Sequence, residues 1–289
     1  MNIDELKLQY EAQGFLHLPS AISPQVVART KQAFDAAAAT YDAQWRKDIA
    51  DGLADARFCD IPDILDRDEV FVDLVDLASL VPLLLALVGP DVQLNHTHAR
   101  LFPPGKTFTA KWHSDLADVI GIDLAHSTSF FLKIHYFFED LRPDQGCLAF
   151  IPGSHRFPPD IPRPVIEDPL NSPLVVRIVP KAGDVVVFNT HLLHMALDND
   201  SPLVRKSLIY AYTHFWVKHY ANAVPSDLQK YATTALRRQL FGVEQEGIAF
   251  FDQRYDGNVN GVVKTSFRSA SKRLLNRILK TSSITRKNK

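Results

Sequence analysis

The most restrictive feature of this chain is a series of short apolar runs that begins after Pro90. The runs are rich in Val, Ile, Phe, Tyr and Thr, and clusters of Gly, Pro, Asn and Asp separate them. They span residues 92–102, 107–113, 128–138, 147–151, 174–179, 184–190 and 204–216. Strands at such spacing, without helices between them, are typical of an antiparallel sandwich or barrel. We therefore expect a mainly β fold whose core spans 91–217.

Helical patterns flank this core on both sides. The expected elements before it are a helix over 3–13 closed by Gly14, a strand over 15–19, a helix from Ser23-Pro24 to about residue 40, and a helix that begins at residue 68 and is kinked or restarted at Pro82. Residues 41–67 are expected to be mostly loop, and 225–241 to be helical up to Gly242. The organisation predicted is one domain over 1–265, with a helical N-terminal region over residues 1–90, the β core 91–217 and a helical appendage 218–265.

Composition excludes some classes of protein. The chain has 289 residues, 46% of them hydrophobic, and a formal net charge of −1, which is ordinary for a globular protein and speaks against nucleic acid as a partner. Its two cysteines, Cys59 and Cys147, lie far apart, so neither a disulfide framework nor a zinc-thiolate site is expected. No apolar run is long enough for a membrane span. A small-molecule partner and a cytoplasmic location are the expectation.

The tail at residues 266–289 differs from the rest of the chain, because it carries eight Lys and Arg residues and no acid. Two interpretations stay open: a solvated terminus, or a basic amphipathic segment that touches an anionic surface. The sequence gives no prediction of the oligomeric state.

The segment Trp112-His113-Ser114-Asp115 carries the first sign of chemistry. Side chains two residues apart on an extended chain point to the same side, so His113 and Asp115 can share one metal ion. Two imidazoles and one carboxylate bind one face of iron(II) and leave the opposite positions open for substrates and O₂. A second histidine from elsewhere in the chain would complete such a group.

That histidine is expected in the apolar strand and turn that end at residue 194. His191 and His194 both precede a turn at 199–202, and the return strand carries Arg205 and Ser207 on one face. An arginine fork with a neighbouring hydroxyl is suited to binding a carboxylate inside a protein. From the residues alone, either histidine could be the ligand.

The order of these motifs resembles the phytanoyl-CoA dioxygenase family of Fe(II)- and 2-oxoglutarate-dependent oxygenases. The resemblance runs from Gly14-Phe15 through Trp-His-x-Asp and Ile151-Pro152-Gly153-Ser154-His155 to about residue 212. It implies a double-stranded β-helix core (jelly-roll, cupin-like) and a reaction that uses iron(II), 2-oxoglutarate and O₂. The reaction expected is hydroxylation of a small molecule, with release of succinate and CO₂.

The resemblance also assigns roles to residues. It makes His113, Asp115 and His194 the metal ligands, because the family places its distal histidine eleven residues before the arginine that binds 2-oxoglutarate. That arginine would be Arg205, assisted by Ser207. One departure is Met195-Ala196, where the family often has Gly-Ser.

Substrate-binding residues are expected on two further strands and beside the motif. The candidates are His96, His98, Arg100, Lys133, His135 and Trp112. If the strand faces that carry the histidines, Arg100 and Lys133 line the barrel interior, the pocket is basic and an anionic substrate is favoured. The alternative is that these side chains contact 2-oxoglutarate itself or face solvent. Two other functions remain as alternatives: a catalytically silent jelly-roll binding protein, and a zinc hydrolase with the same ligands.

Overall fold

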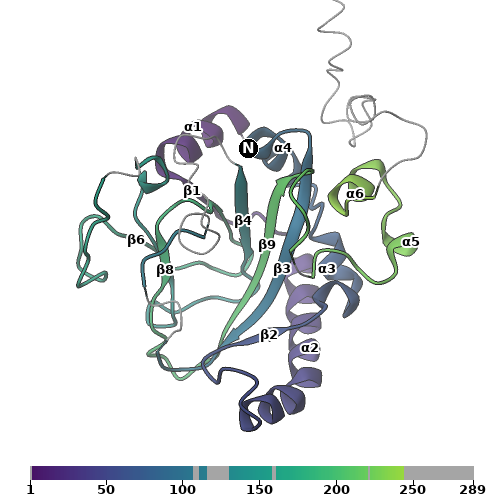
Figure 1. Ribbon diagram of the computed structural model, residues 1–289, viewed down its shortest axis with the longest axis horizontal. Helices are drawn as coiled ribbons and strands as arrows, with labels where there is room; N and C mark the ends of the chain where they lie inside the picture. Colours follow the sequence, from purple (N-terminus) through teal and green to yellow (C-terminus); the bar gives the residue numbers. More distant parts are fainter. Residues whose placement is uncertain (1, 107–110, 116–129, 158–160, 221, 244–289) are drawn as a thin grey trace, which may run out of the picture.

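Two antiparallel sheets form the centre of the computed structural model, which describes residues 2–106, 111–115, 130–157, 161–220 and 222–243 (Figure 1). The larger sheet has the order β1 (Phe15–Leu18), β7 (Val185–Asn189), β4 (Phe131–Tyr136), β9 (Arg205–His214), β3 (Val92–Phe102), β2 (Cys59–Ile61). The smaller sheet has the order β6 (Val176–Ile178), β5 (Leu148–Phe150), β8 (His194–Ala196). All strand pairs in both sheets are antiparallel.

The strand predictions are confirmed for most of the runs. β3 has the predicted bounds, and β4, β5, β6, β7 and β9 lie inside their predicted runs. Two strands of three residues, β2 and β8, were not predicted. Residues 107–110 and 128–129 lie outside the described residues, and residues 111–113 make an isolated bridge at His113 instead of a strand.

Aromatic side chains fill the space between the two sheets. Phe15 of β1 stacks on Phe150 of β5 with ring centroids 4.8 Å apart, and Phe150 lies 5.3 Å from Phe188 of β7. All three rings are buried in one cluster with Ile178 of β6. Burial of a large aromatic side chain stabilises a fold by about 2–3 kcal/mol, so this cluster holds the sheets face to face.

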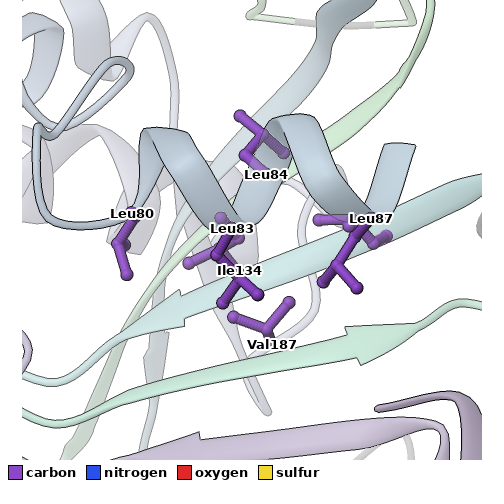
Figure 2. A pocket seen from close by; sticks show the side chains of 7 residues that line it. Leu80, Leu83, Leu84, Leu87, Ile134 and Val187 are labelled. Atoms are coloured by element: carbon purple, nitrogen blue, oxygen red, sulfur yellow. The ribbon is translucent and has the colours of Figure 1, made fainter. Parts of the chain in front are cut away.

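Helices cover the outer face of the larger sheet. They are α1 (Ile3–Gln13), α2 (Pro24–Ala50), α3 (Glu69–Asp73) and α4 (Val81–Val88), with a short 3₁₀ turn at Ile64–Asp66 (η1). A second 3₁₀ turn, Ser154–Arg156 (η3), follows β5. Leu83 and Leu87 of α4 point toward Ile134 and Val187 on the strands below (Figure 2), and the space they enclose is too small for a water molecule.

Three buried tyrosines fix the α3 region on the sheet. The hydroxyls of Tyr136, Tyr210 and Tyr212 donate hydrogen bonds to backbone carbonyls of residues 74, 71 and 75, at 3.0, 2.6 and 2.8 Å. Residue 71 lies in the last turn of α3, residue 74 is its C-cap and residue 75 follows it, and a helix leaves its last acceptors without internal partners. The tyrosines satisfy them, so the helix predicted from residue 68 ends at Asp73 and a new one starts beside Pro82.

Other helix predictions are confirmed in part. α1 ends at Gly14 as predicted, where φ is +83° and a Cβ atom would lie 2.5 Å from Nδ1 of His155. α2 begins at its predicted Ser23 cap, but it continues ten residues beyond residue 40, so the loop prediction for 41–50 was wrong. The helix predicted over 225–241 is two short helices, α5 (Leu228–Tyr231) and α6 (Ala235–Leu240).

His155 gives the fold a pH dependence. The residue is 6% exposed, and Nε2 donates to the Glu11 carbonyl at 3.2 Å. Burial lowers the pKa of His155 from 6.5 to about 4. Between these pH values the unfolded chain binds a proton that the folded chain does not, so stability falls as the pH falls. We expect a loss of about 2 kcal/mol in the free energy of unfolding between pH 7 and pH 5 from this residue.

Urea unfolding of the wild type and His155→Gln at both pH values measures this loss. The glutamine variant keeps a donor for the Glu11 carbonyl but has no titrating group, so its stability should change less. Equal losses in the two proteins would contradict the prediction.

Within the described ranges, no helix is long and apolar enough to cross a membrane. The basic tail 266–289 and the end of the predicted appendage, from residue 244, lie outside those ranges.

Candidate metal centre

Backbone pairing brings the two histidines together. His113 and His194 exchange two backbone hydrogen bonds, of 3.2 and 3.1 Å, as an isolated antiparallel bridge between the 111–115 segment and β8. Residues directly opposite each other in such a pair project their side chains on the same face. The two imidazole centroids are accordingly 4.5 Å apart.

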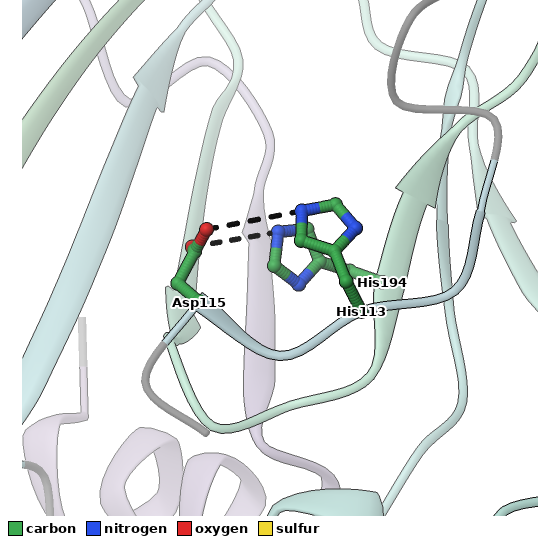
Figure 3. Close-up of side chains that lie close together, drawn as sticks. All are labelled: His113, Asp115 and His194. Atoms are coloured by element: carbon green, nitrogen blue, oxygen red, sulfur yellow. Dashed lines mark ion pairs between the residues drawn. The ribbon is translucent and has the colours of Figure 1, made fainter. Parts of the chain in front are cut away.

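Asp115 completes the group, because it lies two residues after His113 and points to the same side (Figure 3). Its Oδ1 is 3.8 Å from Nε2 of His113, and its Oδ2 is 3.5 Å from Nε2 of His194. One ligand atom from each of the three residues lies within 4.8 Å of the others. His191, the other candidate from the sequence, does not belong to the group.

The protonation of this group suits a metal ion. Nδ1 of His113 lies 2.9 Å from the Lys111 carbonyl, and Nδ1 of His194 lies 2.8 Å from the Leu192 carbonyl. A carbonyl only accepts, so each Nδ1 carries the hydrogen and each Nε2 keeps its lone pair for a metal. Burial lowers the pKa of His194 to about 4, which keeps the imidazole neutral.

Asp115 is a carboxylate at any ordinary pH. Its burial raises the pKa, but the charge of Lys133, which also donates a hydrogen bond to it, outweighs burial and holds the pKa well below the usual range. Two neutral Nε2 atoms and one carboxylate are the donor set that suits a divalent transition metal with open positions.

Arg205 lies at the start of β9 with 2% of its surface exposed. Its Nη1 donates to the Gly146 carbonyl, and its guanidinium lies 5.1 Å from the centroid of the Phe102 ring. Burial lowers its pKa only to about 10, so it remains a cation at neutral pH. No carboxylate of the described residues pairs with it. A buried cation without a counter-ion is costly, which indicates an anionic ligand.

Polar atoms around Arg205 also lack partners. Within the described ranges of the chain, Nε of Arg205, Oγ of Ser207 and Nδ1 of His135 are buried and make no hydrogen bond. Strand alternation and the pairing of β9 with β4 put all three side chains on the inner face of the larger sheet. Unsatisfied buried polar atoms are rare in native proteins, so a group of three indicates a polar ligand.

His135 connects this cluster with the metal ligands. Burial lowers its pKa well below 6.5, and the positive charges of Arg205 and Lys133 act in the same direction. Its ring and that of His194 both contact Phe188, with centroids 5.3 and 4.8 Å away, so His135 lies near the metal ligands and on the same face as Arg205.

The remaining candidates for substrate binding are divided between two places. His96, His98, Arg100, Lys133 and His135 share the inner face with Arg205, because β3, β9 and β4 pair in register. Trp112 instead packs against Cys147, Ala149, Met195 and Leu197. That cluster lies on the opposite side of the chain from His113 and His194, so Trp112 points away from the group.

The inner face is less basic than the sequence indicated. Arg100 binds Asp60 of β2 through two hydrogen bonds, one of them 2.6 Å long, and His98 lies 3.5 Å from the same carboxylate. Lys133 binds Asp115 at 2.9 Å. Asp60 was missed because it sits in a three-residue strand without a pattern of its own. Arg205 is left as the cation without a carboxylate among these described residues.

The comparison with family models gives a match over residues 10–207, to the model described as phytanoyl-CoA dioxygenase. The chain belongs to this family. Its members are non-haem iron- and 2-oxoglutarate-dependent oxygenases, and this member has the two histidines and the carboxylate together. No curated protein matches the chain.

Solved structures of the same fold confirm the predicted double-stranded β-helix. HygX from Streptomyces hygroscopicus, with nickel and 2-oxoglutarate bound, has a TM-score of 0.57 at 17% identity, and the alignment covers 79% of this family member and 94% of HygX. The carbocyclase SnoK from nogalamycin biosynthesis has a TM-score of 0.53 at 19% identity, with 73% and 83% covered. The epimerase SnoN, with Fe³⁺, α-ketoglutarate and nogalamycin RO, has a TM-score of 0.51 at 18% identity, and the alignment covers 86% of this chain and 93% of SnoN.

Proposed function

We propose that this protein binds Fe(II) through His113, Asp115 and His194 and uses 2-oxoglutarate and O₂ to hydroxylate a small molecule. The observation that carries the proposal is a group of two neutral Nε2 atoms and a carboxylate within 4.8 Å. Through Lys133 this group contacts the inner face of the larger sheet, which also carries a buried arginine with no carboxylate partner among the described residues. When bound, the iron would couple oxidative decarboxylation of 2-oxoglutarate to oxidation of a substrate C–H bond.

The protein's own groups would bind and orient the co-substrate. One carboxylate of 2-oxoglutarate would accept hydrogen bonds from the Arg205 fork and from Ser207, whose hydroxyl has no other partner in the described residues. His135 would donate from Nδ1 to the same molecule. A dianion in this place offsets the charge of Arg205, which removes the cost of burying that cation alone.

The charges of the loaded site favour an anionic substrate. Asp60 offsets Arg100, and the negative charge of Asp115 is offset by Lys133. A divalent metal and a dianionic co-substrate cancel each other. Counted together with Arg205, the charges of the loaded site then leave one positive charge in excess, which a monoanionic substrate such as a carboxylic acid would neutralise.

Succinate formation tests the function. The purified protein with Fe(II), 2-oxoglutarate and O₂ is expected to release succinate slowly alone and faster with a true substrate. A panel that pairs small carboxylic acids with their amides separates charge from shape, and we expect the acids to stimulate more. Absence of succinate under all conditions, with zinc bound firmly, would favour the hydrolase alternative. Absence with no metal bound would favour the silent binding protein.

A further inference from the structure

Lys133 forms an ion pair with Asp115, the carboxylate of the metal-binding group. It lies on β4, its side chain is 15% exposed, and its Nζ donates to Oδ2 of Asp115 at 2.9 Å. Its neighbours across the sheet are Phe188 on β7 and Ala211 on β9, and neither carries a charge. Asp115 is therefore the counter-ion of this buried ammonium.

A metal ion would have to share that carboxylate with Lys133. Oδ2 of Asp115 already accepts a hydrogen bond from the Lys133 ammonium, and the same atom is 3.5 Å from Nε2 of His194. We propose that Lys133 is a positioning residue that holds Asp115 and offsets its charge, which weakens metal binding and strengthens binding of the dianionic co-substrate. This inference rests on the proposed function.

The two effects have opposite signs for an electrostatic reason. The ammonium repels a divalent cation nearby and competes for its carboxylate ligand, so it lowers the metal affinity. The same positive charge attracts a dianion that arrives at the loaded centre. In a partly buried site such charge interactions are only partly screened, so changes of about tenfold or more in each affinity are expected.

A purely structural ion pair would behave differently. Removing one partner would leave Asp115 buried without a counter-ion and loosen the site. A loosened site would bind both the metal and the co-substrate more weakly. Opposite changes in the two affinities therefore distinguish the charge effect from damage to the fold.

The test uses Lys133→Met, which keeps the length of the side chain and removes its charge. Mn(II) serves as a redox-stable probe, and the EPR signal of the free ion gives its affinity at pH 7.5. Calorimetry on Mn(II)-loaded protein then gives the affinity for 2-oxoglutarate. Lys133→Arg keeps the positive charge while changing the side chain, so it shows whether substitution at this position by itself disturbs the fold.

Lys206→Met is the matched control. Its side chain is 20% exposed, similar to that of Lys133, and its Nζ lies 2.6 Å from Asp35 on the outer face of the sheet. We expect Lys133→Met to bind Mn(II) about tenfold or more tightly and 2-oxoglutarate about tenfold or more weakly. Lys206→Met and Lys133→Arg should stay near the wild type in both.

Unchanged affinities in Lys133→Met, or a loss of both, would overturn the inference. A different result would contradict the proposed function: wild-type protein that binds Mn(II) but does not bind 2-oxoglutarate. The two failures are therefore distinguishable in one set of titrations.

Discussion

Replacing His194 by alanine is expected to lower the affinity for Fe(II) by more than a hundredfold and to abolish succinate formation. Changes to residues that merely support metal ligands cost about 10–100-fold in affinity, so loss of a ligand must cost more. His194 supplies one of the two neutral Nε2 atoms, and β8 holds it opposite His113. Anaerobic titration with Fe(II), or with Mn(II) as a stable substitute, measures the loss.

His191→Ala is the control for this variant. The two histidines lie three residues apart, but only His194 has its imidazole beside Asp115, at 3.5 Å. We expect His191→Ala to bind metal as the wild type does. If His191→Ala lost the metal and His194→Ala kept it, the assignment of the third ligand would be wrong.

Replacing Arg205 by methionine is expected to raise the dissociation constant for 2-oxoglutarate by about a hundredfold to several thousandfold, because a buried charge pair broken on one side costs about 3–5 kcal/mol. Metal affinity should not change, since Arg205 is not a ligand. Calorimetry with metal-loaded protein measures the first quantity, and metal titration the second.

The same variant has a second expected effect, on stability. Arg205 is 2% exposed and has no carboxylate partner in the described residues, so its charge is a cost in the ligand-free protein. We expect thermal unfolding of ligand-free Arg205→Met at a temperature no lower than that of the wild type. A marked drop, with 2-oxoglutarate affinity unchanged, would make Arg205 a structural residue.

Arg205→Lys separates charge from geometry. Lysine keeps the positive charge, but it cannot form the two parallel hydrogen bonds of a guanidinium with a carboxylate. Its affinity for 2-oxoglutarate should lie between those of the wild type and the methionine variant.

The core of the fold could be predicted because its signals are local. β3 and β9 are long runs of β-branched and aromatic residues bounded by turns, and their bounds follow from those runs. The metal group could be predicted for a related reason. His113 and Asp115 lie on one short segment. The resemblance to the dioxygenase family gave a spacing of eleven residues between the distal histidine and the arginine, and this spacing selected His194.

The missed features depend on contacts between distant residues. The end of α3 is set by tyrosine hydroxyls more than sixty positions away, and no nearby residue marks it. The extra turns of α2 are held by Tyr41 and Trp45, which pack against the core but show a weak periodicity. β8 has three residues, and its bounds depend on pairing with β5.

The charges of the inner face could not be predicted for the same reason. The sequence does not show that Arg100 and Lys133 are neutralised, because their partners, Asp60 and Asp115, lie forty and eighteen positions away. Alternation along a strand predicts which side chains share a face, but not which of them are neutralised. These two ion pairs leave Arg205 as the cation that is proposed to bind the co-substrate.

The measurement that tests the central claim most directly is anaerobic visible spectroscopy of the protein with Fe(II) and then 2-oxoglutarate. A bidentate oxoacid on iron(II) gives a weak charge-transfer band, so wild-type protein should develop one on addition of 2-oxoglutarate. The band should be absent in His194→Ala and should require much more 2-oxoglutarate in Arg205→Met. A folded wild-type protein that binds Fe(II) and shows no band at saturating 2-oxoglutarate would contradict the proposed function.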